Sequence, residues 1–279
     1  MTVAVTAAGG KLGRLVVEAL LAAGEQPVAI VRDPSKVADL AARGAQVRQA
    51  SYDDPAALDA ALAGVDRVLL ISGTEFGKRV AQHTNVLRAA ERAGVELLAY
   101  TSIPRADSNP MLLAAEHRGT EEVLASAAVP TVLLRNSWYW ENYTGAVANA
   151  AQSGVLYGAM AAGRVSGAAR ADYAEAAARV LTGAGHEGRV YELGGDEALT
   201  GADLAAAVAE AKGSPVRYAD LSTDDYAAAL RAAGLEEQYA AVLADADAGI
   251  GEGLLEVTTG DLTELLGRPA TSASTVFAQ

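Results

Sequence analysis

The amino-acid sequence predicts an α/β protein, with a doubly wound parallel sheet in its first half and a smaller α/β cap in its second. Short runs rich in β-branched residues alternate along the first half with segments that repeat apolar residues at helical spacing. Some runs, such as residues 68–71, are apolar at every position, as in a sheet covered on both faces. A glycine-rich turn at residues 8–10 separates the first run from the first helix. Right-handed crossovers between such strands give a doubly wound sheet.

The predicted strands are short, rich in β-branched or apolar residues and bounded by turn residues. They span residues 2–6, 28–31, 46–49, 65–72, 96–102 and 131–134. The helices between them are indicated by apolar periodicity and by start or stop residues, such as Pro55 at a first helical turn and a closing Gly24. They run from residue 12 to Gly24, from Pro34 to near Gly44, and over residues 54–63, 80–93 and 116–127.

The second half contains shorter segments, which we interpret as a cap over the carboxyl ends of the sheet. Helices are expected near residues 172–181, 201–212 and 223–233, and a strand near residues 189–193. Asp172 and Ser222 stand at helix starts, and both residue types cap the free N–H groups found there.

Composition excludes several classes of protein. The chain has no cysteine and a net charge of −13, which rules out a disulfide scaffold and thiol catalysis and argues against a nucleic-acid partner. Its three histidines lie far apart, so no metal site is expected. No apolar run approaches the roughly 20 residues that span a bilayer, and no signal peptide is visible. We therefore expect a cytoplasmic protein without a membrane partner.

The turn at residues 6–13 is the sharpest functional signal. It reads Thr-Ala-Ala-Gly-Gly-Lys-Leu-Gly, which matches a G-x-x-G-x-x-G spacing except that Ala7 replaces the first glycine. Between a strand and a helix, such a turn binds a dinucleotide pyrophosphate at the helix N-terminus. The alternative is a plain strand–helix turn. Ala7 is harmless with a negative φ and costly otherwise. The predicted cofactor contacts here are Thr6, Gly9, Gly10, Lys11, Leu12 and Gly13.

Residues after the later strands extend this site. Arg32 follows the second strand, where a guanidinium can pair with the 2′-phosphate of NADP(H), and Lys36 adds a second positive charge. The alternative is a solvated arginine, and Asp33 leaves some use of NAD open. The remaining contacts are predicted after the third strand, at the adenine, and after the fourth, on the nicotinamide side. They are Tyr52 and Asp53, then Ser72 and Gly73.

The chain resembles the NmrA-like, atypical short-chain dehydrogenase/reductases. The resemblance rests on the turn at 6–13, Val-Arg-Asp-Pro at 31–34, Ser-Tyr-Asp at 51–53 and Leu-Leu-Ile-Ser at 69–72. Further segments are similar to type 2 NADPH:quinone oxidoreductases and to the related triphenylmethane dye reductases. These are Ala-Tyr-Thr-Ser at 99–102, Ala-Glu-His at 115–117, Leu-Arg-Asn-Ser-Trp-Tyr at 134–139 and Glu-Asn-Tyr at 141–143.

The resemblance implies an NADP-binding Rossmann-type domain over residues 1–135 and a substrate-binding cap over residues 136–279. Part of the cap, about residues 165–195, would pack back on the first domain. It also implies an NAD(P)H:quinone oxidoreductase that uses NADP(H) and passes hydride directly to a quinone-like acceptor, with no flavin and no metal. Thr101, Ser102 and His117 join the expected cofactor contacts.

The chain departs from ordinary short-chain dehydrogenases, which use Tyr-x-x-x-Lys. At the matching place it reads Leu-Ala-Ala-Glu-His over residues 113–117, so the tyrosine is missing and His117 replaces the lysine. A quinone needs less help than a ketone, because it accepts hydride readily and its reduced oxygen takes a proton from water. We hypothesise that His117 orients the nicotinamide ribose or the substrate oxygen. The alternative is a surface histidine on a helix.

An aromatic cluster follows the sixth strand in a chain that has only two tryptophans. Trp138, Tyr139 and Tyr143 are predicted to stack on a flat substrate, and Asn142 to donate to its oxygen. His117, Tyr139 and Asn142 are thus the candidate catalytic residues. The alternative is that these rings only pack the cap.

A second class of function stays open at this stage. Some NmrA-like proteins bind the dinucleotide without turning it over and regulate a transcription factor by protein contact. A reductase of a biosynthetic pathway would share the chemistry with another substrate. Alanine-rich helices also leave a homodimer open.

Overall fold

The computed structural model describes all 279 residues and divides them between two compact units. Unit 1 comprises Met1–Asp107, Glu116–Arg135 and Ala171–Tyr191. Unit 2 comprises Ser108–Ala115, Asn136–Arg170 and Glu192–Gln279. Each unit is therefore built from three separate stretches of chain. The expected cofactor role of residues 1–135 and substrate role of residues 136–279 stay predictions.

The central sheet has seven strands in the order β3-β2-β1-β4-β5-β6-β8. The strands are β1 (Val3–Val5), β2 (Val28–Val31), β3 (Gln46–Gln49), β4 (Arg67–Leu70), β5 (Leu97–Ser102), β6 (Thr131–Asn136) and β8 (Val190–Leu193). Pairing is parallel from β3 through to β6. The chain adds strands outward from β1 first on one side and then on the other. This arrangement confirms the predicted doubly wound parallel sheet.

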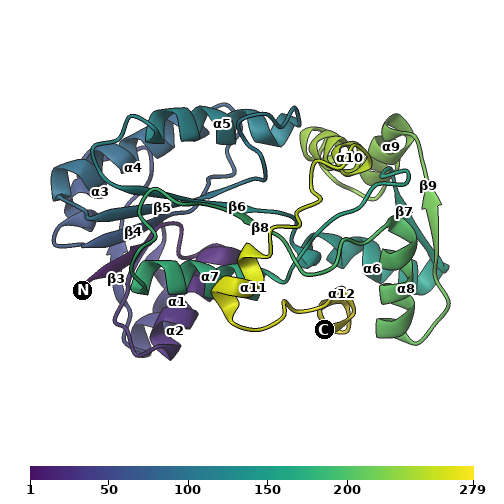
Figure 1. The fold of residues 1–279 in the computed structure, drawn as a ribbon, viewed down its shortest axis with the longest axis horizontal. Helices are drawn as coiled ribbons and strands as arrows, with labels where there is room; N and C mark the ends of the chain where they lie inside the picture. Colours follow the sequence, from purple (N-terminus) through teal and green to yellow (C-terminus); the bar gives the residue numbers. More distant parts are fainter. The chain divides into compact units, whose positions relative to one another are not determined.

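Helices cover both faces of this sheet (Figure 1). One face carries α1 (Lys11–Ala22), α2 (Ala38–Ala42) and α7 (Arg170–Thr182). The other carries α3 (Pro55–Leu62), α4 (Arg79–Ala93) and α5 (Leu112–Leu124). The core under α3 and α4 is apolar and fully buried, with Ile30, Val68, Leu70 and Leu98 from the strands against Leu62 from a helix. Burial on both faces explains why these strands are apolar at consecutive positions.

Several boundaries differ from the prediction for identifiable reasons. The segment from Pro34 is a 3-10 turn, η1 (Pro34–Val37), followed by the short α2, because the Asp33 carboxylate accepts from the N–H of Ser35. Helix α5 begins at Leu112 rather than at residue 116. The N–H of Leu112 donates to Asp245 over 2.8 Å. That partner is distant in sequence, so local spacing did not reveal it.

Unit 2 contains a two-stranded parallel sheet of β7 (Val155–Gly158) and β9 (Arg217–Asp220), which the sequence did not predict. Helices α8 (Gly201–Lys212) and α9 (Thr223–Ala232) confirm two expected helices. The remaining elements were not predicted. They are η2 (Trp140–Tyr143), α6 (Thr144–Ser153), α10 (Glu237–Gly251), α11 (Asp261–Leu266) and α12 (Ala273–Phe277).

Of the two predicted helix caps, that of Ser222 is confirmed and that of Asp172 stays a prediction. Ser222 caps α9, because its side chain accepts from the N–H of Asp225. At the start of α7 the N–H of Arg170 donates to the carboxylate of Glu141, and Asp172 lies buried in the first turn. None of the helices in the structure combines the length and the apolar character needed to cross a membrane.

Candidate functional site

The turn between β1 and α1 brings backbone unusually close to the helix. A Cβ atom on Gly13 would lie 2.4 Å from the carbonyl oxygen of Ala7, so only glycine fits there. Gly10 is the N-cap of α1, has no side chain to cap the helix, and is exposed together with Gly9 and Lys11. The first turn of α1 also contains no acidic residue. Its amides and the positive end of the helix dipole are therefore open to an anion.

Ala7 has a φ of +47°, in the left-handed region. Glycine enters this region freely, whereas a Cβ atom costs roughly 1–2 kcal/mol there. The turn therefore keeps the conformation of the glycine motif although alanine stands at its first position. The arrangement fits the pyrophosphate of a dinucleotide, with Ala7 as a strained element of the turn.

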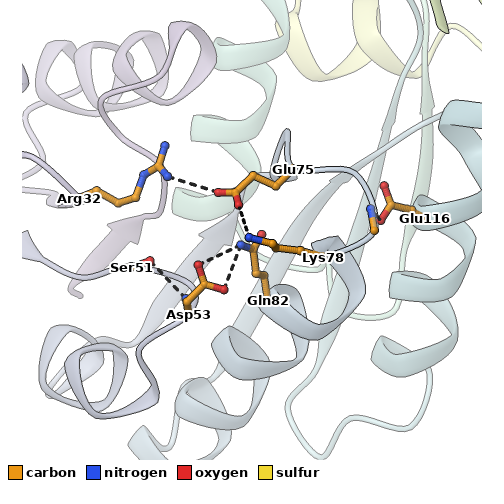
Figure 2. A network of polar contacts seen from close by, with 8 residues as sticks. Arg32, Ser51, Asp53, Glu75, Lys78, Gln82 and Glu116 are labelled. Carbon is orange, nitrogen blue, oxygen red and sulfur yellow. Dashed lines mark hydrogen bonds and ion pairs between the residues drawn. The ribbon is translucent and has the colours of Figure 1, made fainter. Parts of the chain in front are cut away.

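Arg32 and Lys36 follow β2, as predicted. The Arg32 guanidinium is exposed and pairs with the Glu75 carboxylate over 3.3 Å, as Figure 2 shows. The Lys36 side chain is exposed and lies against the turn at Gly9. Asp33 is turned to the adjacent helix start, and hydrogen bonds from Ser35 lower the pKa of its carboxyl. Two exposed cations therefore follow β2, and the carboxylate that pairs with Arg32 comes from another loop.

Tyr52 and Asp53 follow β3, and hydrogen bonds to other elements hold both side chains. Tyr52 bonds to residues that follow β1 and β4, and Asp53 bonds to α4. The Tyr52 hydroxyl donates to the carbonyl of Ile71 over 2.9 Å and lies 2.5 Å from the Thr6 hydroxyl. Burial raises the pKa of Tyr52. The amide of Gln82 donates to both carboxylate oxygens of Asp53, over 3.1 and 3.2 Å (Figure 2). Asp53 is exposed, so a carboxylate is held in a fixed orientation at the edge of the sheet.

Thr6 is fully buried and joins β1 to β4. Its hydroxyl donates to the carbonyl of Leu69 and accepts from the N–H of Ile71, both over 3.0 Å. These contacts fix the start of the glycine-rich turn relative to the end of β4.

Ser72 and Gly73 follow β4, and backbone contacts hold both of them. The N–H of Ser72 donates to the Thr101 hydroxyl over 2.9 Å. The N–H of Gly73 donates to Nε2 of His83 over 2.9 Å, so this nitrogen is unprotonated. Nδ1 of His83 then carries the hydrogen, and it lies 2.9 Å from the hydroxyl of Thr120. Burial and the nearby Arg79 lower the pKa of His83 to about 3.

His117 is buried in α5 and contacts two other polar side chains. Its Nε2 lies 2.8 Å from Nη2 of Arg79, and its Nδ1 lies 2.9 Å from the Tyr100 hydroxyl. Burial, followed by the charge of Arg79, lowers the pKa of His117 well below its usual value. Arg79 is itself buried, and Glu116 lies 4.0 Å from its guanidinium. His117 is therefore a neutral, fixed imidazole rather than a surface histidine.

Ser102 belongs to a buried charged group. Its hydroxyl donates to Glu121 over 2.6 Å, and Arg135 donates to both oxygens of the same carboxylate. Side chains from β5, α5 and β6 are thereby tied together at the carboxyl end of the sheet.

In unit 2 the aromatic cluster divides into two environments. Trp140 packs with Tyr143 and Phe277, and a Cβ atom on Gly167 would lie 2.5 Å from its ring. Trp140 therefore belongs to the core of unit 2. The Tyr139 ring has the guanidinium of Arg170 over it, 5.0 Å from its centroid.

The predicted substrate contacts differ in exposure. Trp138 and Tyr143 are mostly buried, and the Tyr143 hydroxyl has no hydrogen-bond partner in the protein. The Asn142 side chain is exposed. Burial, followed by Asp247, raises the pKa of Tyr143 well above its usual value.

Sequence reasoning missed the side chains that hold the predicted ones. Gln82 fixes Asp53, Arg79 fixes His117, and Glu75 pairs with Arg32. The only available signal was position, since Arg79 and Gln82 open the helix that follows β4. Their partners are distant in sequence, so spacing alone did not identify them.

A doubly wound sheet with an open glycine turn defines a dinucleotide-binding protein. The model of the NAD(P)H-binding family matches residues 7–183, and the chain belongs to this family. Among curated proteins it is 48% identical to quinone oxidoreductase 2 of Escherichia coli (strain K12) over 272 residues. That match covers 97% of this chain and 95% of the relative.

Solved structures give the same result. The E. coli NADPH-dependent quinone oxidoreductase QOR2 complexed with NADPH has a TM-score of 0.95 and 47% identity, covering 99% of this chain and 98% of that one. The Citrobacter sp. triphenylmethane reductase complexed with NADP(H) has a TM-score of 0.94 and 34% identity, covering 99% and 100%. A structure of NmrA, at 16% identity and a TM-score of 0.84, shares the fold. These matches confirm the resemblance and the Rossmann-type fold expected from the sequence.

Proposed function

We propose that this protein is an NADPH-dependent oxidoreductase that reduces a quinone-like, flat acceptor by direct hydride transfer, without flavin or metal. The observation that carries the proposal is its 48% identity, over almost the whole of both chains, with quinone oxidoreductase 2 of E. coli. The open turn at the N-terminus of α1 and the cations after β2 support the same cofactor class. When bound, the nicotinamide supplies the hydride.

The binding roles follow from position and exposure. In this proposal the amides at the start of α1 hold the pyrophosphate, and Arg32 with Lys36 holds the 2′-phosphate. Asp53, fixed by Gln82, accepts a hydrogen bond from the adenine amino group. Ser72, Gly73, Thr101 and Ser102 lie at the carboxyl ends of β4 and β5 and form the nicotinamide side. The protein's main contribution is to position the reacting carbon against the acceptor.

His117 acts by position in this proposal. Its low pKa makes it a poor proton donor at neutral pH. It holds Arg79 and the hydroxyl of Tyr100 in place under the loop that carries Ser72 and Gly73. The reduced acceptor then takes its proton from water, which a quinone permits because its reduced oxygen needs no aligned phenol.

Trp138, Tyr139 and Tyr143 are proposed to contact the flat substrate, and Asn142 to donate to its oxygen. The exposure of Asn142 supports its role. The position of Arg170 over Tyr139 places a cation next to one of these rings.

The test is oxidation of NADPH by the purified protein with a panel of quinones and no added flavin, followed by the absorbance of the reduced nicotinamide. We expect turnover, with a primary isotope effect when the transferred hydrogen of NADPH is deuterium. Arg32→Ala is expected to raise KM for NADPH by about 10-fold or more, since it removes a charge-assisted contact to the phosphate. KM for NADH should change little.

Arg92→Ala is the matched control, because Arg92 is an exposed arginine of the same unit that pairs with Asp59. Its kinetic constants should equal those of the wild type. Binding of NADPH without oxidation on any quinone or dye would contradict the proposal and favour a non-catalytic dinucleotide sensor.

A further inference from the structure

Glu75 lies in the loop between β4 and α4 and bridges two cations. Its Oε1 is 3.3 Å from Nη1 of Arg32, and its Oε2 is 3.2 Å from Nζ of Lys78. Figure 2 shows this carboxylate between the two positive side chains. A carboxylate from a different loop thus forms an ion pair with the guanidinium that would bind a 2′-phosphate in the proposed function.

The loop that carries Glu75 is fixed on both sides of it. The N–H of Gly73 donates to His83, and the N–H of Gly77 donates to Oε1 of Glu116 over 2.9 Å. At the other end of the ion pair, the Gln49 amide donates to the carbonyl of Arg32 over 3.0 Å. The backbones on both sides are therefore held, and the pairing of Glu75 with Arg32 is a built feature of this edge of the sheet.

From this geometry we propose that Glu75 is a specificity-determining residue that weakens the preference for NADPH over NADH. The inference rests on the proposed function, because it assigns the cofactor choice of the same site. The Glu75 carboxylate takes the place of the 2′-phosphate on Arg32, and the phosphate must displace it in order to bind.

The physical argument is competition between two anions for one guanidinium. Arginine binds both carboxylate and phosphate, and Oε1 of Glu75 already contacts Nη1 of Arg32, so a phosphate must displace Glu75 to engage that nitrogen. The Arg32 side chain is 75% exposed and that of Glu75 39% exposed, so the ion pair is weak enough to be displaced. A phosphate monoester carries more negative charge than a carboxylate, so it displaces Glu75 from Arg32. The displacement costs free energy, so NADPH binds less tightly than it would without Glu75.

The same carboxylate favours the binding of NADH in this proposal. Its ribose has a free 2′-hydroxyl, and an acidic residue near the end of the second strand accepts a hydrogen bond from that group in NAD-binding folds. Asp33 stands at the end of β2, but its carboxylate accepts from Ser35. Glu75 therefore supplies the acceptor from the opposite loop, and it favours NADH by the contact that disfavours NADPH.

The experiment is calorimetric titration of the free protein with NADPH, NADH and 2′-AMP, comparing the wild type with Glu75→Gln. We expect Glu75→Gln to bind NADPH and 2′-AMP about three- to fivefold more tightly at low ionic strength, the scale of an exposed ion pair. Affinity for NADH should stay equal or fall. Unchanged or weaker binding of NADPH, or an equal gain for both dinucleotides, would overturn the proposal.

Asp59→Asn is the matched control, because it removes the same charge from an exposed ion pair of the same unit, with Arg92. It should leave all three affinities unchanged. Repeating Glu75→Gln in an Arg32→Ala background separates competition from simple repulsion. The gain must vanish there, and its persistence would contradict the competition.

These outcomes are distinct from those of the proposed function. If the wild type binds NADPH and reduces quinones while Glu75→Gln changes nothing, only the role of Glu75 fails. If the wild type binds no NADPH, the proposed function itself fails.

Discussion

The guanidinium of Arg79 donates from Nη2 to Nε2 of His117 over 2.8 Å. A guanidinium has no acceptor, so Nε2 of His117 is unprotonated and its hydrogen lies on Nδ1, facing the hydroxyl of Tyr100. His83 has the same tautomer for a different reason, because the N–H of Gly73 donates to its Nε2. Two neutral imidazoles thus flank the ring of Tyr100. Burial is the main reason that the pKa of Tyr100 is raised to about 12.

The first prediction concerns these tautomers. In a nitrogen-15 spectrum of the histidine side chains, His83 and His117 should both show a hydrogen on Nδ1 at neutral pH. Neither signal should titrate between pH 8 and pH 5, because the pKa of His83 is lowered to about 3 and that of His117 well below 6.5. A titration midpoint near pH 6.5 for His117 would contradict the structure and restore a general acid at this position.

The second prediction is loss of stability in acid. The pKa of His83 is about 3 in the folded protein and 6.5 when unperturbed, so the unfolded chain binds more protons between these values. The contribution of His83 to stability is therefore fully present above pH 6.5 and is lost as the pH drops towards 3, by an amount on the order of 4 kcal/mol. Urea unfolding across this range measures the slope. The difference in free energy of unfolding between the wild type and His83→Gln should change across this range, and a difference independent of pH would exclude a contribution from His83.

The third prediction has the opposite sign. Asp247 is buried in unit 2, accepts from the N–H of Ala159 over 2.9 Å, and faces Tyr143, Tyr218 and Tyr226. Burial is the main reason that the pKa of Asp247 rises to about 7 from 3.8. The folded state holds the extra proton in this window, so the contribution of Asp247 to stability falls as the pH rises from about 4 to 7.

Asp247→Asn tests this effect, because an amide keeps an acceptor for Ala159 without a charge. The variant should be more stable than the wild type at pH 8 and about equal to it at pH 4. Asp245→Asn is a poor control because Asp245 accepts from Leu112. Asp224→Asn on the exposed start of α9 is the better one, and it should keep the wild-type slope.

The fourth prediction concerns the strained turn. Ala7 has a φ of +47°, so Ala7→Gly should raise the free energy of unfolding by about 1 kcal/mol. Glycine removes the cost of the left-handed conformation, and its greater conformational freedom in the unfolded chain offsets part of this gain. Thermal unfolding measures it. Ala8→Gly, at a buried neighbour with ordinary φ, should instead destabilise by about 0.5–1 kcal/mol. Equal effects of the two changes would contradict strain at Ala7.

The fifth prediction concerns close packing at the same turn. Gly13→Ala places a Cβ atom 2.4 Å from the carbonyl of Ala7, and the backbone must shift to accept it. We expect a loss of about 1–3 kcal/mol in stability together with weaker NADPH binding. Gly145→Ala in α6 is the control, since no atom lies within 4 Å of the added carbon. A Gly13 variant as stable as this control would refute the packing argument.

The sequence predicted those parts of the fold that local chemistry determines. The strands β2 and β3 matched to the residue, because turn residues bound each of them. Helices α6 and α10 escaped notice, since alanine dominates them and gives little contrast between a buried and an exposed face.

For the candidate site, too, the sequence predicted only what depends on position along the chain. Arg32 and the turn at residues 6–13 could be placed from their positions after strands. Glu75 could not be assigned to Arg32, because 43 residues separate the two partners. Trp140 shows the limit for aromatics: a tryptophan beside predicted substrate contacts packs against Gly167 in the core, and only the fold distinguishes these two uses of one residue type.

The segmented construction of unit 1 has a consequence for the order of synthesis. The guanidinium of Arg67 in β4 donates to the carbonyl of Leu181 at the end of α7, over 3.1 Å and 114 residues of chain. A nascent chain therefore carries the first six strands before α7 exists to cover its face of the sheet. Unit 1 is complete only when Tyr191 has emerged from the ribosome, by which time Asn136–Arg170 of unit 2 has already been made. Unit 1 therefore cannot complete its fold before two of the three stretches of unit 2 have been synthesised.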